Sequence, residues 1–85
     1  MYLHLGQNVV VLESSVIGIF DMDNTTGSHI TRKFLNEAER AGRIASAPED
    51  LPKSFVVCDG GGGMEVHLSQ LASVTLAKRK LYHKL

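Results

Sequence analysis

Apolar residues alternate with polar ones at the start of the chain and then recur in short continuous runs. Leu3 and Leu5 show the two-residue period of a half-buried strand, and the polar segment Gly6 to Asn8 follows with residues that are common in turns. The next run, Val9 to Leu12, is rich in β-branched residues and too short for a helix. The pattern therefore predicts a short strand, a turn and a second strand, paired as a hairpin.

The most apolar stretch of the chain, Val16 to Phe20, predicts a third strand. Both faces of this strand are apolar, so we expect it in the centre of a sheet, between helix and sheet neighbours. Gly18 indicates either a β-bulge or a place where another backbone approaches closely.

From Ser28 to Ala41 the period changes to that of an amphipathic helix, and Gly42 follows as the expected stop. A helix of this length is marginal alone in water, so its apolar face is expected to lie on the sheet. That face is formed by Ile30, Phe34, Ala38 and Ala41, with Leu35 at its edge.

The second half of the chain repeats these signals more weakly. Ile44 to Lys53 contains two prolines and reads as a surface connection without a regular element. Phe55 to Cys58 predicts a fourth strand and Met64 to Leu68 a fifth, with Gly60 to Gly63 as a flexible hairpin loop between them.

The chain closes with a short helical segment for which Ser69 is the expected cap. Its shared side is formed by Leu71, Val74, Lys78 and Leu81. The whole chain, residues 1–85, is therefore predicted to be a small single domain of the α+β class. It combines an antiparallel or mixed sheet of about five strands with one main amphipathic helix and a short C-terminal helix.

Charge and cysteine usage narrow the class of protein. Nine basic and nine acidic side chains cancel, although Lys78 to Lys84 form a local cationic tail. The lone Cys58 cannot form an internal disulfide and is expected to be a small buried hydrophobe in a reducing compartment. With no basic leader and no apolar run of ~20 residues, we expect a cytoplasmic protein without a membrane partner.

An apolar strand closed by Asp21-x-Asp23-x-Thr25 is similar to the nucleophile motif of haloacid-dehalogenase-type phosphatases. In that reading Asp21 attacks a phosphoryl group, Asp23 is the acid and base, and both carboxylates hold Mg²⁺. Such sites are built at the ends of several parallel strands, for which the chain is too short. Acidic residues at a strand-to-helix turn also favour the turn itself, so we expect no enzyme and no catalytic residue.

Other binding motifs are incomplete. A calcium loop beginning at Asp21 lacks its glycine and its final glutamate, and the run Gly60 to Gly63 lacks the Lys and Ser/Thr of a phosphate-binding loop. His4 and His67 meet only if their strands pair, and outward-facing strand histidines are the favoured interpretation. We therefore expect no metal, no cofactor and no small-molecule substrate.

Nucleic-acid binding is the class that the basic residues favour. The exposed side of the main helix carries Arg32, Lys33, Arg40 and Arg43, diluted by Glu37 and Glu39. On a monomer this is the pattern of a solvated helix face. A symmetric oligomer would repeat it and add the weak patches together.

The order of these elements resembles the RemA/RemB family of bacterial extracellular-matrix (biofilm) regulators, most closely its RemB-like branch. The resemblance covers nearly the whole chain and rests on order and spacing. It is carried by Met1 to Gly6, Val10-Val11, Val16 to Asp21, Phe34-Leu35, Pro52 to Val57, Ser69, Leu71, Thr75-Leu76 and Lys78-Arg79.

The resemblance implies a transcription regulator that forms homo-oligomers, ring-shaped in RemA-like members, and binds DNA through outward arginines. One family arginine cluster falls at Asp50 to Lys53, where only Lys53 is basic, and another arginine falls near Ser15. We therefore predict phosphate contacts from basic residues spread over the chain. They are Arg32, Lys33, Arg40, Arg43, Lys53, Lys78 and Arg79. The alternative is an oligomeric protein-interaction module that binds no DNA.

Overall fold

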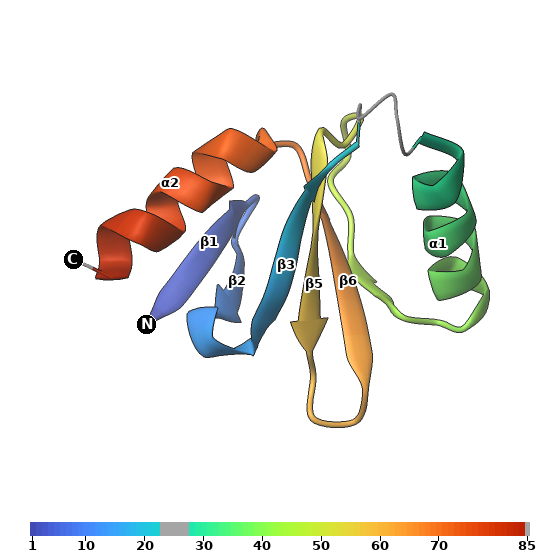
Figure 1. Cartoon of the computed structure of the whole chain (residues 1–85), viewed down its shortest axis with the longest axis horizontal. Helices are drawn as coiled ribbons and strands as arrows, with labels where there is room; N and C mark the ends of the chain where they lie inside the picture. The colour runs from blue at the N-terminus through green and yellow to red at the C-terminus, as the bar shows by residue number, and fades with distance from the viewer. Residues whose placement is uncertain (23–27, 85) are drawn as a thin grey trace.

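The computed structural model describes residues 1–22 and 28–84, and within them it has six strands in two sheets and two α-helices (Figure 1). This confirms the α+β class. The elements are β1 (Tyr2–Gly6), β2 (Val9–Leu12), the 3-10 turn η1 (Glu13–Ser15), β3 (Val16–Asp21), α1 (Ser28–Arg40), β4 (Ile44–Ser46), β5 (Ser54–Asp59), β6 (Met64–Ser69) and α2 (Ser73–Lys84).

The strands are divided between a β1-β2 hairpin and a four-stranded sheet in the order β3-β5-β6-β4. The prediction of one sheet was therefore wrong, although the predicted mixture of antiparallel and parallel pairing is present in the larger sheet. β3 lies at the edge of that sheet, not at its centre. Its second apolar face, which suggested a central strand, borders an open hollow beside α1.

The first hairpin is closed by a two-residue turn in which Gln7 and Asn8 both have positive φ, 48° and 65°. These are the backbone angles of a type I′ turn, whose twist matches that of the flanking strands. The predicted hairpin is confirmed, and a register shift between His4 and Gly6 interrupts its ladder before the last pair, Gly6 with Val9.

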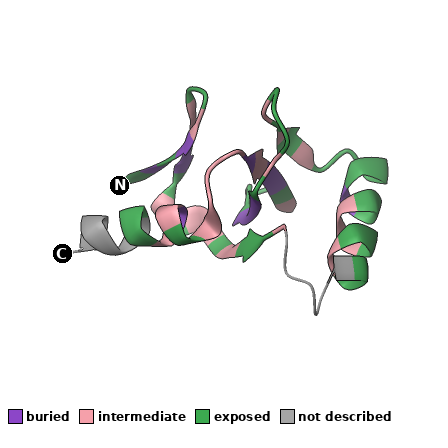
Figure 2. Cartoon of the chain, turned by 90° about the horizontal axis from the view of Figure 1, so that it is seen from above, coloured by how far each residue is buried: buried purple, intermediate pink, exposed green. Residues whose placement is uncertain are grey.

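One face of the four-stranded sheet is covered by the hairpin and α2, and we call the apolar cluster between them the closed core (Figures 1 and 2). Its buried members are Leu3, Leu5, Val11, Val56, Cys58 and Leu76. The Ser69 hydroxyl donates to the Leu5 carbonyl at 2.7 Å and accepts from the Leu71 amide at 3.0 Å. Ser69 thus ties the hairpin to the sheet, and the prediction that it caps α2 was wrong, because α2 begins at Ser73.

The predicted apolar side of the C-terminal helix was also wrong. Leu76 is fully buried and Val74 is exposed, whereas the side chain of Leu81 lies outside the described residues. Leu71 packs against the closed core from the segment that precedes the helix. The shift follows from the later start of α2, which changes the residues that face the sheet.

The opposite face of the sheet is covered by α1 alone, through a cluster of Ala38, Phe55, Val57 and Val66 with Phe34 and Leu35 beside it. The amphipathic helix is confirmed, but the prediction that Ile30 and Ala41 pack on the sheet was wrong, since both are exposed. The helix rests on the sheet through its middle and C-terminal part.

The segment predicted to be irregular contains a short strand, β4, which pairs in parallel with β6. Three residues without alternation give no strand signal, and the pairing depends on where α1 returns the chain. At this pairing Ser46 Oγ and His67 Nδ1 lie 2.7 Å apart in a hydrogen bond. His67 is buried, so the expectation of outward-facing strand histidines was wrong for it.

The glycine run lies at the tip of the β5-β6 hairpin, as predicted. The Gly60 amide donates to the Gly63 carbonyl at 2.8 Å and closes the turn. The Arg43 guanidinium, at the end of the α1 connection, donates to the Met64 carbonyl at 3.0 Å. A side-chain β-carbon at position 63 would lie 2.6 Å from that guanidinium, so this glycine leaves room for the arginine.

Candidate nucleic-acid interface

The side of α1 that faces away from the sheet carries a cluster of polar and charged side chains. Six residues line a shallow depression of about 330 Å³ along the helix. They are His29, Arg32, Lys33, Asn36, Glu37 and Arg40, and we call this surface the α1 face. A helix rises 1.5 Å per residue, so the face extends over roughly 16 Å.

The α1 face is locally positive although the whole chain is neutral. Three cations, Arg32, Lys33 and Arg40, stand against the single carboxylate of Glu37, and all four side chains are exposed. Exposed guanidinium and ammonium groups on long, flexible side chains are suited to contact phosphate oxygens. The face suits a polyanion better than a compact ligand.

Sequence reasoning found the three cations of this face but missed His29 and Asn36. His29 lies three residues before Arg32, and Asn36 lies four residues from both Arg32 and Arg40. This helical spacing is the sequence signal that would have included them. Asn36 adds an amide with two donors and an acceptor, which is the side-chain type that pairs with adenine in the major groove.

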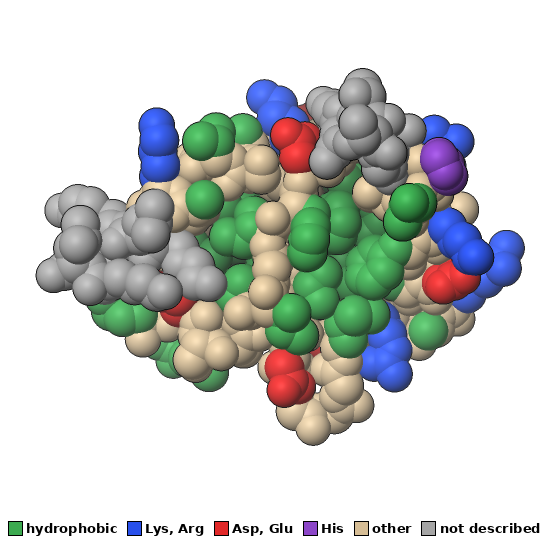
Figure 3. Space-filling view, viewed as in Figure 1, with side chains coloured by type: hydrophobic (Ala, Val, Ile, Leu, Met, Phe, Trp, Pro, Cys, Tyr) green, Lys and Arg blue, Asp and Glu red, His purple; other side chains and the backbone are tan. Residues whose placement is uncertain are grey.

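The remaining predicted contact residues are not brought to this face. Arg79, on α2, donates to the His4 carbonyl at 3.1 Å, and Arg43 is bound to the Met64 carbonyl. Lys78 also belongs to α2, which lies on the other side of the sheet from α1 (Figure 1). Figure 3 shows basic side chains at both sides of the molecule. Lys53 is exposed in the segment that enters β5. Of the predicted contact residues, only Arg32, Lys33 and Arg40 therefore lie together on one surface of a single chain.

The two positions to which the family resemblance assigns arginines are also separated. Ser15 precedes β3 and Lys53 precedes β5, and these strands are antiparallel, with Val16 opposite Cys58 and Asp21 opposite Ser54. The two positions thus lie at opposite ends of a strand pair of about six residues, or roughly 20 Å.

The acidic residues of the phosphatase hypothesis do not assemble into a two-carboxylate site in the described chain. Asp21 ends β3 beside the first residue of β5, whereas Asp59 ends β5 at the far end of the same strand pair. Asp23 lies outside the described residues. Across residues 1–22 and 28–84, His, Cys, Asp and Glu side chains form no group of three that could hold a metal ion.

A polar cluster around the buried His67, which the sequence did not reveal, joins β4 and β6. The His67 ring is held by Ser46 on one nitrogen, and its other nitrogen lies 3.7 Å from a Glu65 carboxylate oxygen. Ser46 and His67 are 21 positions apart, so no local motif signals their approach. The bond fixes β4 to the sheet edge at its register with β6.

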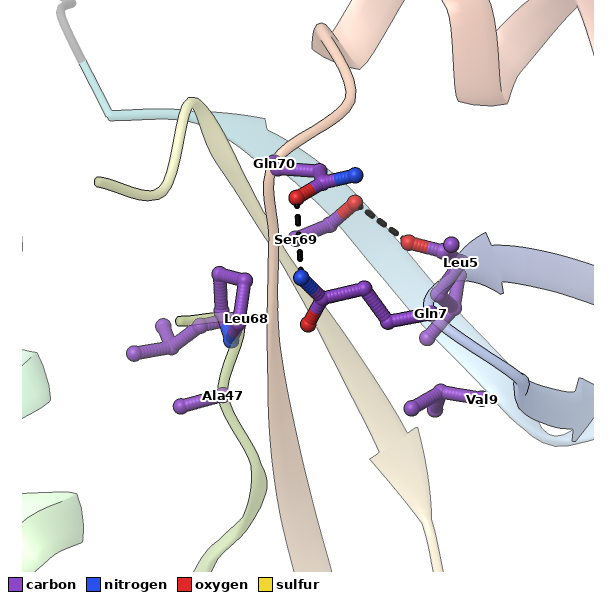
Figure 4. A pocket seen from close by; sticks show the side chains of 9 residues that line it. Leu5, Gln7, Val9, Ala47, Leu68, Ser69 and Gln70 are labelled. Atoms are coloured by element: carbon purple, nitrogen blue, oxygen red, sulfur yellow. Dashed lines mark hydrogen bonds between the residues drawn. The ribbon is translucent and has the colours of Figure 1, made fainter. Parts of the chain in front are cut away.

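The pocket in Figure 4 is a seam between the hairpin and the sheet. Gln7 donates its side-chain amide to the Gln70 side-chain oxygen at 3.1 Å across this seam, next to the Ser69–Leu5 bond. Its volume of about 10 Å³ admits no more than one water molecule. The seam joins two elements and has no room for a substrate.

Comparison with known proteins assigns the chain to a family. Residues 2–79 match the model of RemA-like proteins, described as extracellular matrix regulatory protein A-like. The chain is also 34% identical over 79 residues to extracellular matrix regulatory protein B of Bacillus subtilis (strain 168), covering 93% of this chain and 89% of that protein. The chain belongs to the RemA-like family.

Membership of the RemA-like family places the chain among regulatory proteins of the extracellular matrix and confirms the predicted resemblance, including its RemB-like character. This RemA-like chain carries its basic α1 face on an α+β scaffold whose two helices lie on opposite faces of one sheet. Neither described helix is both long and apolar enough to cross a lipid bilayer.

Proposed function

We propose that this RemA-like protein is a cytoplasmic, non-enzymatic regulator that binds DNA as a homo-oligomer, with the α1 faces of several copies contacting the phosphate backbone. The observation that carries the proposal is the α1 face itself. It gathers three exposed cations around one carboxylate on a regular element, whereas the other predicted contacts are dispersed.

Oligomerisation follows from the amount of charge available. One α1 face neutralises about three phosphates, which gives weak binding at physiological salt. Repetition of the face in a symmetric assembly multiplies the contacts, and the binding of each further copy becomes intramolecular. Lys53 and the position of Ser15, at opposite ends of one strand pair, would then be brought near each other only between neighbouring copies.

The proposal is tested by fluorescence anisotropy with duplex DNA at a series of salt concentrations. We expect wild-type binding whose logarithm falls linearly with the logarithm of salt. The triple variant Arg32→Ala, Lys33→Ala, Arg40→Ala should bind at least ~10-fold more weakly at low salt. Its slope per copy should be reduced by about three, because each lost phosphate contact removes about one unit.

Lys78→Ala is the matched control, because it removes an exposed cation from the opposite side of the sheet. It should change the salt slope by less than one third of the triple variant's effect. Equal affinities for the triple variant and the wild type would reject the α1 face. Failure of the wild type to bind any duplex at low salt would reject DNA binding altogether.

A second function, an oligomeric protein-interaction module that binds no DNA, is favoured by one observation. An apolar hollow between α1 and the sheet is open to solvent, and exposed apolar patches mark protein-binding surfaces. A wild-type oligomer that leaves duplex anisotropy unchanged at low salt would select this function over the first.

A further inference from the structure

The hollow between the first half of α1 and the four-stranded sheet has a volume of about 420 Å³, and we call it the apolar hollow. One wall is β3, which contributes Ile17 and Phe20, and the other is α1, which contributes Ile30 and Phe34. Among the described residues that line it, Thr31 is the sole polar one. Figure 3 shows apolar side chains gathered over the middle of the sheet. The volume lies within the ~300–1,000 Å³ of small-molecule sites.

The apolar hollow follows from the way α1 rests on the sheet. Ala38 is 3% exposed, whereas Ile30, two turns earlier, is 66% exposed, so the helix touches the sheet at one end and leaves it uncovered at the other. The Phe55 ring stacks on Phe20 at 5.1 Å and on Phe34 at 5.8 Å between ring centroids. These contacts join the floor to both walls, so the space is formed before a ligand enters it.

β3 is shaped to line this hollow. A register shift between Val16 and Gly18 marks a β-bulge, which confirms one of the two roles predicted for the glycine. The bulge sends Val16 to the closed core but Ile17 to the hollow. A β-carbon at Gly18 would lie 2.7 Å from the Phe20 ring, so the glycine also allows that ring to lie along the strand.

A second hollow, of about 330 Å³, adjoins the first at Met64, which lines both. It lies between the connection that follows α1 and the tip of the β5-β6 hairpin, and its charged side chains are Arg43 and Glu65. Neighbouring residues of a strand point to opposite faces, so Glu65 leaves β6 on the other face from Met64. Its carboxylate lies 3.7 Å from the His67 ring. The charge on the Met64 side is therefore that of the Arg43 guanidinium.

Arg43 is held in position from three sides. Its backbone amide donates to the Ala38 carbonyl at 2.9 Å, and its carbonyl accepts from the Val66 amide at 2.8 Å. Its guanidinium donates one N–H to the Met64 carbonyl at 3.0 Å. Among the described residues no carboxylate forms an ion pair with it. A guanidinium has five N–H groups, so most of its donors can serve a ligand at the Met64 end of the apolar hollow.

We propose that the two hollows together bind a small amphipathic carboxylate, with its hydrocarbon chain in the apolar hollow and its carboxylate on Arg43. The charges are complementary, because the guanidinium fork matches the two oxygens of a carboxylate. The remaining lining is apolar, which suits a hydrocarbon chain and excludes a second charge. This site goes beyond the proposed function and does not depend on DNA binding.

The exposed apolar area favours a small molecule over a protein surface. Ile17, Phe20 and Ile30 are between 46% and 67% exposed. Large apolar side chains cover ~150–250 Å² each, so these three present on the order of 300 Å². A standard protein interface buries ~800 Å² on each partner. A hydrocarbon chain of eight to ten carbons needs no such area, and its charged head uses the cation that an uncharged apolar ligand would leave unpaired.

The first test is isothermal titration calorimetry of the whole chain with decanoate, octanoate and hexanoate. We expect saturable binding of one molecule per chain. Each buried methylene contributes about 4-fold in affinity, so each step of two methylenes should weaken binding ~15-fold. Equal affinities along the series would overturn the proposal. Absence of saturable binding would overturn it too, and is the result expected if a second copy or a protein partner covers the hollow.

The second test concerns the head group. Octanoate should bind at least ~10-fold more tightly than octanol, because hydrogen bonds between charged groups are the stronger ones. Arg43→Gln keeps an amide donor for the Met64 carbonyl but removes the charge, so it should lower octanoate affinity to that of octanol. Lys78→Gln is the matched control, since it removes an exposed cation on the other side of the sheet. Equal binding of octanoate and octanol by the wild type would reject the contact with Arg43.

The third test concerns the hydrocarbon chain. Ile30→Glu and Ile17→Glu each place a carboxylate in one wall of the apolar hollow, at positions exposed enough for the fold to tolerate it. Both should weaken octanoate binding at least ~10-fold, because a buried charge without a partner is unfavourable. Leu51→Glu, at an exposed apolar residue outside both hollows, should keep the wild-type affinity.

Circular dichroism identifies the variants that remain folded, and two walls provide a second variant if one unfolds. A folded Ile30→Glu or Ile17→Glu protein that binds octanoate as tightly as the wild type would place the ligand elsewhere and overturn the proposal. The DNA proposal is judged by a different measurement, so loss of either one leaves the other standing.

Discussion

The two faces of the four-stranded sheet differ in how completely their apolar side chains are buried (Figure 2). The face beneath the hairpin and α2 has six residues at 8% exposure or less, among them Leu3, Val56 and Leu76. The face beneath α1 has a small buried cluster around Phe55 and then opens into the apolar hollow between α1 and the sheet, where Phe20 remains half exposed.

The two faces therefore contribute to different properties, the closed core to stability and the face beneath α1 to recognition. The closed core uses elements from both ends of the chain to exclude water, which is where burial stabilises the fold most. The hollow beside α1 leaves apolar area in water, and exposed apolar patches of this kind mark binding surfaces. Substitutions on the two faces should therefore change different observables.

The largest effect on stability is expected in the closed core. Leu76→Ala leaves a cavity beside Leu3 and Val56 and should lower the free energy of unfolding by about 2–5 kcal/mol. Ile30→Ala on the open face should change it by less than about 0.5 kcal/mol, since an exposed side chain loses little. Urea denaturation of both variants and of the wild type at one protein concentration measures the two changes. Similar losses for the two variants would contradict the contrast between the faces.

An intermediate effect is expected at Gly18, where a register shift after Val16 marks a β-bulge in β3. Gly18→Val puts a side chain where the Phe20 ring lies, so the ring must leave its stacked position on Phe55. The free energy of unfolding should fall by about 1–3 kcal/mol, as for other overpacked sites, and urea denaturation measures it. Gly62→Ala is the control, because a β-carbon there meets open space and the backbone needs no positive φ. A Gly18→Val protein with unchanged stability would show that the stacking of Phe20 on Phe55 does not stabilise the fold.

The smallest effect concerns Cys58 in the closed core. Burial raises the pKa of its thiol, a hydrogen bond with Ser15 lowers it, and the nearby carboxylate of Glu65 raises it. The net pKa is raised, so the folded state holds the proton more tightly, and this stability is complete below the unfolded pKa and lost as pH rises through the folded pKa. Urea midpoints measured upward from pH 7 should fall more steeply for wild type than for Cys58→Ala. Parallel curves would exclude a buried thiol with a raised pKa.

Much of this fold follows from local patterns. The first hairpin, α1 and the glycine-tipped hairpin were predicted because alternation, helical period and turn residues agree over those segments. The elements that the sequence misplaced depend on distant partners. β4 has three residues and is defined by its parallel partner β6, and Ser69 bonds to Leu5, 64 positions away, instead of capping the next helix.

The candidate site was predictable only in part for the same reason. Helical spacing places Arg32, Lys33 and Arg40 together, but nothing local shows that Arg79 is held by the His4 carbonyl, 75 positions earlier. The apolar residues of β3 gave the opposite error. Ile17 and Phe20 looked like core because a groove wall has the same composition as a core, and the two differ in what covers them.

The closed core packs β1 against α2, so β1 can be buried only after α2 has been synthesised. Leu3 and Leu5 are covered by Leu76, and Arg79 and Ser69 bind carbonyls of the first strand. During synthesis the apolar side of the hairpin therefore stays exposed to water until α2 has emerged. Contacts so distant in sequence slow folding, and a ribosome paused before α2 would present a chain prone to aggregation.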